Sequence, residues 1–345
     1  MVKSIKLFVG AIVAMSLVAG GAVIAHGEEY FKDKTIFFVV GYSPGGSFDA
    51  YTRLIARHFA KHVPGSPTTI VQNMTGAGGM IAANYIYNKA KPNGLTIGAW
   101  ASGLVLQNIM GNKATKFDGR KFGWLGVPSA YDTVCTFRKE SGIKSMEDWF
   151  TAKRPIKIGA IGPGTSTSDV PKLLKVAIGL PMQVIDGYRG GAKVRLALEA
   201  GEVDGYCGSW QTLKAISRSA LASGKISMVL QTSLKSHPEI KDVPLAIHYA
   251  KTPEARQFLS IAQSVYGGQF LYSVPPGMPK DRLQVLQRAF VETLRDPELL
   301  AEAKKAKLEI DPIDGPATAK VFASLYNLDS AVISTLKEIL VPKKK

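Results

Sequence analysis

Cysteine and histidine are scarce in this chain of 345 residues, which holds two cysteines and five histidines. So few residues of these types exclude a disulfide-rich scaffold and argue against a structural zinc site. Cys135 and Cys207 either pair in an oxidising compartment or lie apart as buried apolar residues, and the sequence leaves both interpretations open. His58 and His62 stand four residues apart, but no neighbouring Glu and no third ligand accompany them. We interpret them as a partly exposed helix face and expect no metal and no cofactor.

Long apolar runs are missing after the N-terminal segment. Lys3 and Lys6 form a basic head before the apolar run Leu7 to Val23, and the small residue Ala25 follows. This order predicts a secretory signal peptide over residues 1–25, cleaved near Ala25, and a periplasmic mature protein. A retained membrane anchor is the alternative, but three glycines interrupt the run and no basic stop-transfer cluster follows it. No cysteine lies near the cleavage site, so we expect no lipid anchor.

Acidic residues are outnumbered, since 27 Asp and Glu face 43 Lys and Arg and give a formal net charge of +16. A basic protein attracts nucleic acids, anionic lipids or anionic small molecules. Here the basic residues are scattered, and the only run, Lys343 to Lys345, is a terminal tail. We therefore expect no nucleic-acid partner and take the charge as support for an anionic small-molecule ligand.

The chain is rich in one repeated order, in which a strand leads through a glycine-rich loop to a helix. Strands are predicted at Thr35 to Val40, Thr68 to Gln72, Leu95 to Trp100, Pro155 to Ala160, Met182 to Ile185 and Val203 to Cys207, and helices at Phe48 to Val63, Met80 to Lys89, Val170 to Ile178, Val194 to Ala200, Lys280 to Arg295 and Pro297 to Lys307. This order is typical of parallel α/β sheets. We expect a first lobe from residues 26–128 and 232–345, a second lobe from 129–231, and a hinge between them.

Two of these loops have the composition of an anion site. Gly41 to Asp49 and Thr75 to Gly79 each join a strand to the start of a helix. Glycines let the backbone turn sharply, and a helix N-terminus offers unpaired N–H groups and a positive dipole end. Adjacent loops of this kind at the carboxyl edge of a sheet suit the two oxygens of one carboxylate. We expect Asp49 to order the first loop through backbone N–H groups, because its charge would repel an anionic ligand.

The segment Gly41 to Gly45 also fits the G-x-S-x-G elbow of serine hydrolases, with Ser43 as nucleophile. In that elbow the residue after the serine donates its N–H to the oxyanion. Here that residue is Pro44, which has no N–H, and His237 and His248 have no evident triad acid. A hydrolase using Ser43 is therefore the less favoured alternative. Gly76 to Gly79 lacks the third glycine and the downstream acid of a dinucleotide fingerprint.

At these loops the sequence resembles the extracytoplasmic receptors of tripartite tricarboxylate transporters, the Bug family. Pro44 to Asp49 matches that family's P-G-G-x-x-D loop, and Asn73 to Gly79 matches N-x-P-G-A-G-G with Thr75 in place of Pro. Tyr188 to Ala192 matches Y-[KR]-G-G-A, and Gly201 to Asp204 matches G-x-V-D. The ordered set covers nearly the whole predicted mature chain. Phe48 stands at a position that is usually small or polar, and Asp186 and Gly187 replace a common Val-Pro.

The resemblance implies a type II periplasmic-binding fold, in which two lobes, each a mostly parallel sheet flanked by helices, close on a ligand. It implies a solute receptor without enzymatic activity and without catalytic residues, which delivers a small carboxylate to transporter membrane subunits. We expect the receptor to act as a monomer. The expected ligand-binding residues are Tyr42, Ser43, Gly45, Gly46, Ser47, Phe48, Asp49, Gly76, Ala77, Gly78, Gly79, Ser102, Ser129, Tyr131, Gly164, Thr165, Ser166, Tyr188, Arg189, Gly190 and Asp204.

The identity of the acid depends on the second lobe. Arg189 is the expected partner of a second carboxylate, because a guanidinium matches carboxylate geometry. Tyr42, Phe48, Trp100, Tyr131 and Trp210 fall near strand ends that face the expected cleft, which favours an aromatic or hydrophobic acid beside the di- and tricarboxylates. A sensor subunit with the same ligand and a signalling partner is the alternative role.

Overall fold

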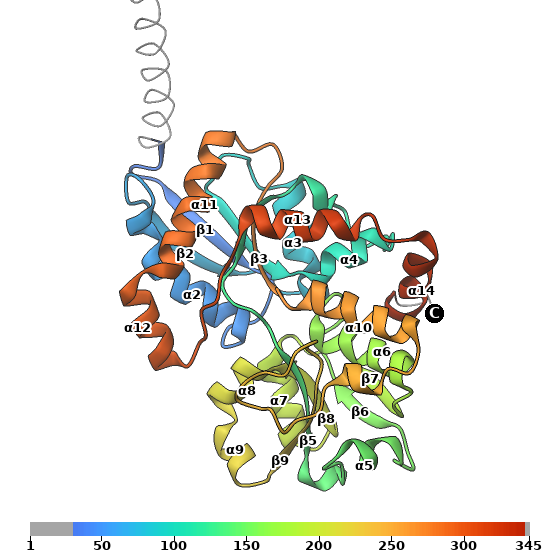
Figure 1. Cartoon of the computed structure of the whole chain (residues 1–345). Helices are drawn as coiled ribbons and strands as arrows, with labels where there is room; N and C mark the ends of the chain where they lie inside the picture. The colour runs from blue at the N-terminus through green and yellow to red at the C-terminus, as the bar shows by residue number, and fades with distance from the viewer. Residues whose placement is uncertain (1–29, 342–345) are drawn as a thin grey trace, which may run out of the picture.

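The computed structural model of the protein describes residues 30–341. The predicted signal peptide and the basic tail from Lys343 to Lys345 lie outside these residues. Within residues 30–341, no helix is both long and apolar enough to cross a membrane. Two lobes, each built on one sheet, lie one above the other in Figure 1, and connecting segments of the chain run between them.

The first sheet has the strand order β11-β4-β10-β3-β1-β2. Its strands are β1 (Thr35–Val40), β2 (Thr68–Asn73), β3 (Thr96–Ala101), β4 (Gly123–Val127), β10 (Phe270–Val274) and β11 (Ile313–Asp314). β1 runs parallel to β2 and β3, as the glycine-loop pattern predicts. β10 is antiparallel to both β3 and β4, so the sheet is mixed rather than mostly parallel.

The second sheet has the order β7-β6-β8-β5-β9. Its strands are β5 (Thr133–Arg138), β6 (Ile156–Gly159), β7 (Met182–Ile185), β8 (Gly205–Ser209) and β9 (Ile226–Gln231). β6 is parallel to β7 and β8, whereas β5 is antiparallel to β8 and β9. Cys135 and Cys207 stand directly opposite each other on β5 and β8 and form a disulfide. The structure thus decides between the two interpretations that the sequence leaves open.

The helices pack on these sheets through apolar stripes spaced for an α-helix. They are α2 (Ser47–Phe59), α3 (Met80–Asn88), α4 (Gly103–Ile109), α5 (Met146–Phe150), α6 (Ser166–Ile178), α7 (Gly191–Glu199), α8 (Trp210–Ile216), α9 (Arg218–Ala222), α10 (Pro253–Tyr266), α11 (Lys280–Arg295), α12 (Pro297–Ala306), α13 (Gly315–Leu325) and α14 (Ser330–Leu340). In α2, for example, Tyr51, Leu54, Ile55 and Phe59 are buried.

The chain passes between the lobes after β4 and again before β10. The segment after β9 stays beside the second sheet, since Gln231 bridges Leu245 and Ile240 packs with Val134 and Trp210. α10 packs on both α4 and α6, and α14 also packs on both. Residues 240–245, which we expect in the first lobe, thus lie beside the second sheet.

Candidate functional site

Three parallel strands of the first lobe end side by side. Val40 of β1 pairs with Asn73 of β2 and with Ala99 of β3, so the loops that follow these strands share one edge of the sheet. The loop after β1 leads into α2, and the loop after β2 leads through a short 3₁₀ turn, η2 (Ala77–Gly79), into α3. This arrangement places two helix N-termini at one edge of the sheet, where open α/β sheets bind ligands.

Asp49 ties the two loops together. Its carboxylate accepts hydrogen bonds from the N–H of Gly45 at 3.0 Å, from Arg53 Nε and from Asn73 Nδ2 at 2.9 Å. Asn73 Nδ2 also donates to the carbonyl of Tyr42. Burial alone would raise the pKa of Asp49, but the bonds from Arg53, Gly45 and Asn73 outweigh it and hold that pKa below its ordinary value. The predicted ordering contact between Asp49 and the glycine loop is present.

Gly79 has no room for a side chain. Its φ of +93° is left-handed, and a Cβ there would lie 2.7 Å from the hydroxyl oxygen of Tyr42. That hydroxyl donates to the carbonyl of Gly78 at 2.8 Å. The close approach joins the first loop to the second and keeps both in one shape. Ala77 and Gly78 donate their N–H groups to no backbone carbonyl in residues 30–341, so both groups are free for a ligand.

The second lobe repeats this design. β6 and β7 are parallel neighbours, and the loops after them lead into α6 and α7. Asp169, in the first turn of α6, accepts the N–H of Gly164 at 2.9 Å, as Asp49 accepts that of Gly45. Asp169 is fully buried and also accepts from the hydroxyl of Tyr266 at 2.6 Å. Burial raises the pKa of Asp169 to about 6, against the lowering effects of Lys172, Tyr266 and Gly164.

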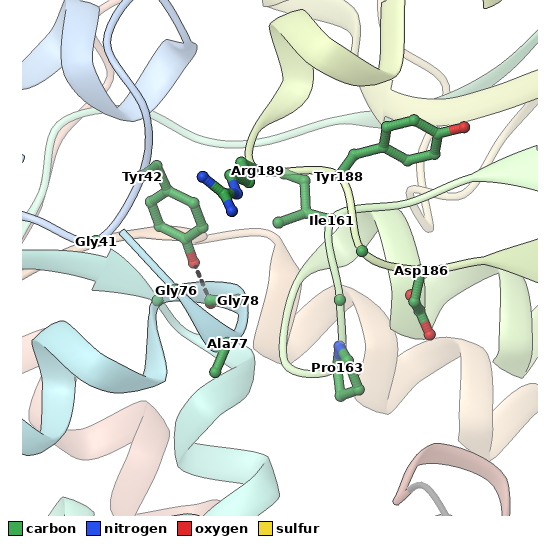
Figure 2. Close-up of a pocket in the computed structure, with 13 residues that line it drawn as sticks. Gly41, Tyr42, Gly76, Ala77, Gly78, Ile161, Pro163, Asp186, Tyr188 and Arg189 are labelled. Carbon is green, nitrogen blue, oxygen red and sulfur yellow. Dashed lines mark hydrogen bonds between the residues drawn. The ribbon is translucent and has the colours of Figure 1, made fainter. Parts of the chain in front are cut away.

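The four loops enclose a pocket of about 270 Å³ between the lobes. Figure 2 shows Tyr42 and Gly76 to Gly78 on one side, facing Ile161, Pro163 and Asp186 on the other, while the Arg189 guanidinium extends toward Tyr42. Arg189 is exposed at this pocket, and no carboxylate among residues 30–341 forms an ion pair with it. It is therefore a cation available to an anion in the pocket.

Aromatic rings fill the space next to this pocket. Tyr42 stacks on Phe48 with ring centroids 4.0 Å apart, and Phe270 contacts both Phe48 and Tyr131 edge-on. The cavity left among them is about 30 Å³, and its walls include Gly46, Ser47 and Gly190. A space of this size holds about one water molecule, so the pocket among the loops is the larger of the two spaces.

Direct hydrogen bonds join the lobes across the cleft. The Ser43 hydroxyl donates to the carbonyl of Arg189 at 2.7 Å, and Ser47 Oγ lies 2.6 Å from Thr212 Oγ1. The two lobes are therefore closed on each other in this structure. The bond from Ser43 goes to a backbone carbonyl, so in this arrangement its hydroxyl is a contact between lobes and is not paired with a general base.

Of the predicted residues, seven line the pocket and six line the adjoining aromatic cavity, with Tyr42 in both. The pocket has Tyr42, Gly76, Ala77, Gly78, Gly79, Tyr188 and Arg189, and the cavity has Tyr42, Gly46, Ser47, Phe48, Tyr131 and Gly190. Ser43, Gly45 and Asp49 shape the first loop. Ser102 and Ser129 are buried, and so are Gly164, Thr165 and Ser166, where Ser166 Oγ donates to the hydroxyl of Tyr131.

Three expected cleft residues lie elsewhere. The carboxylate of Asp204 accepts from Arg154 and from the N–H of Lys157, near the start of β6 and away from the loops that follow it. Trp100 is fully buried and donates to Ser273, and Trp210 donates to Glu239. Trp100 and Trp210 do lie near the ends of β3 and β8, as predicted, but they line neither the pocket nor the aromatic cavity.

The sequence interpretation missed several lining residues. Gly41, Gly162 and Gly187 belong to loops that the glycine pattern marks, so their positions were within its reach. Tyr206, Gln269 and Phe270 also line the aromatic cavity. They come from β8 and from the region around β10, and only the tertiary fold brings them to the cleft.

Comparison with known proteins gives a consistent set of likenesses. Residues 52–337 match the family described as "Tripartite tricarboxylate transporter family receptor". The "UPF0065 protein in tcbD-tcbE intergenic region" of Pseudomonas sp. (strain P51) is 23% identical over 279 residues, covering 80% of this chain and 78% of that protein.

Two solved structures share the fold at low sequence identity. The periplasmic binding protein BugD has a TM-score of 0.72 at 20% identity and covers 91% of this chain and 100% of its own. MatC (Rpa3494) from Rhodopseudomonas palustris, with bound malate, has a TM-score of 0.69 at 20% identity and covers 89% of this chain and 99% of its own. Both likenesses support the two-lobed binding-protein fold.

Proposed function

Because the chain belongs to the family of tripartite tricarboxylate transporter receptors, we propose that it captures a small organic carboxylate in the pocket between its lobes. The observation that carries this proposal is the meeting of four strand-to-helix loops, two from each lobe, around one space of about 270 Å³. One carboxylate of the ligand accepts the free N–H groups of Ala77 and Gly78. No cationic side chain of the first lobe is required for this contact.

Arg189 supplies the contact at the other end of the ligand. Arg189 belongs to the second lobe, its guanidinium extends into the pocket toward Tyr42, and no carboxylate of residues 30–341 forms an ion pair with it. A second carboxylate there gains two parallel N–H donors. The pocket is slightly smaller than the usual 300–1,000 Å³ of drug-sized ligand sites. A short dicarboxylate of the size of malate, which is bound to the related fold of MatC, therefore fits better than a bulky aromatic acid.

The cycle needs binding and closure but no bond-making chemistry. A ligand that contacts loops of both lobes binds the closed form better than the open form, and so shifts the population toward it. We propose that the closed receptor then docks on transporter membrane subunits in the periplasm. Loss of the receptor should abolish uptake of the labelled acid. If uptake is unchanged and only acid-induced gene expression is lost, the sensor role is the correct one.

Thermal-shift screening of the chain from about residue 26 tests the ligand class. A ligand well above its Kd adds a few kcal/mol to the stability of the folded state, which gives a clear rise in Tm. We expect short dicarboxylates to raise the Tm of the wild type. Arg189→Ala should weaken this response, while Arg218→Ala, an exposed arginine of α9, should leave it unchanged. A response to sugars, amides or amines and to no acid would contradict the proposal.

A further inference from the structure

A second and larger cavity lies on the second lobe, apart from the four loops. It has a volume of about 730 Å³, within the range of small-molecule sites. Its floor comes from β5, β8 and β9, and its walls come from α7 on one side and from α8 and α9 on the other, at the lower left of Figure 1. We call it the lateral groove; its lining includes Thr136, Arg138, Arg195, Tyr206, Leu213 and Lys225.

The lateral groove combines apolar side chains with basic groups. Leu198 and Leu213 are buried in its walls, and the ring of Tyr206 lies in its floor. Arg195 and Lys225 also line it, and neither has an ion-pair partner in residues 30–341. Apolar surface beside unpaired cations is suited to a molecule with one apolar part and one anionic part.

Arg138 adds an unsatisfied donor to the lateral groove. Its Nε is buried and has no hydrogen-bond acceptor among the described residues, which is uncommon because an unpaired buried donor is costly. Its Nη1 lies 3.5 Å from Glu140, so part of its charge is already paired. Glu199 is a second acid in the lining. With two carboxylates present, the lateral groove favours a ligand with a single negative charge over a polyanion.

We propose that the lateral groove binds an organic monoanion with an aromatic or branched apolar body. The body lies on Leu198, Leu213 and the Tyr206 ring, and the anionic group faces Arg195 and Lys225. This site does not depend on the carboxylate pocket. The two are close, however, because Tyr206 also lines the aromatic cavity of the cleft.

Titration of the whole predicted mature chain with anilinonaphthalene sulfonate tests this proposal, because that dye is an aromatic monoanion whose fluorescence rises in apolar sites. The wild type should bind it saturably. Arg195→Ala/Lys225→Ala should weaken the affinity by roughly tenfold or more, since two charge-assisted contacts are lost. Lys139→Ala/Lys193→Ala is the matched control, because it removes the same charge from exposed neighbours that do not line the lateral groove; its affinity should stay within about twofold of the wild type.

A steric variant separates the lateral groove from other dye sites. Ala220 lies in the lining of the lateral groove, so Ala220→Trp fills it and should abolish saturable binding. Unfolding curves must match the wild type before the affinities are compared. Three results would each overturn the proposal: no saturable binding to the wild type, equal affinity in the two double variants, or unchanged affinity in Ala220→Trp. None of these results bears on carboxylate binding in the pocket between the lobes.

Discussion

Replacement of Asp169 by Asn should change how the stability of the protein depends on pH. Asp169 is fully buried at the start of α6, and one of its oxygens has no hydrogen-bond partner in the described chain. Burial raises the pKa of this carboxyl from its ordinary value of 3.8 to about 6. The folded state therefore holds this proton more tightly than the unfolded state does.

The sign and size of the effect follow from these values. The stabilising contribution of the protonated Asp169 is fully present below about pH 4 and is lost as the pH rises through about 6. The difference corresponds to roughly 3 kcal/mol, because each tenfold change in proton affinity is worth ~1.4 kcal/mol. Relative to Asp169→Asn, the wild type should lose about this much free energy of unfolding between about pH 4 and about pH 8.

Urea unfolding at a series of pH values, with the disulfide intact, measures this difference. Asp204→Asn is a control of opposite sign, because the hydrogen bonds from Arg154 hold the pKa of Asp204 below its ordinary value. Relative to Asp204→Asn, the free energy of unfolding of the wild type should increase as the pH rises through the acidic range. Wild-type and Asp169→Asn curves that stay parallel across the whole range would refute the reasoning about burial.

Three further changes test the loops and the scaffold. Ser43→Ala removes the cross-lobe hydrogen bond to Arg189, so it should weaken ligand affinity by about threefold to tenfold, as measured by calorimetry. Unchanged affinity would mean that this bond does not favour closure. Gly79→Ala places a Cβ against the Tyr42 hydroxyl in a left-handed backbone, and should lower the Tm and abolish ligand binding; a normal Tm with full binding would contradict the loop geometry. Replacing both Cys135 and Cys207 by Ala should cost about 2–5 kcal/mol in urea unfolding, and the loss should equal that caused by reducing the wild type.

The parallel units were predictable because their signals are local. β1 and β7 have the predicted bounds, since each is a short apolar run that ends at a glycine-containing loop. β10 and β5 were not predicted. Both are short runs that pair antiparallel with strands distant in sequence, β10 with β3 and β5 with β8. Pairing of this kind is decided by the tertiary fold.

In the candidate site, too, the residues with a local sequence signal were predictable and those placed by the tertiary fold were not. The glycine loops and Arg189 could be named from the sequence, because each loop lies between a strand and a helix within one segment. Tyr206 and Phe270 could not, because they reach the cleft from separate strands. Phe48 was marked as unusual by its position in the loop, and its stacking on Tyr42 now gives that position a physical role.

A crystal structure of the mature receptor with the acid that gives the largest thermal shift would show how the ligand lies between the lobes. We expect one carboxylate within hydrogen-bond distance of the N–H groups of Ala77 and Gly78, and the other end of the ligand beside Arg189. An acid bound with its carboxylate turned away from both glycine loops of the first lobe, or bound only outside the cleft, would contradict this expectation.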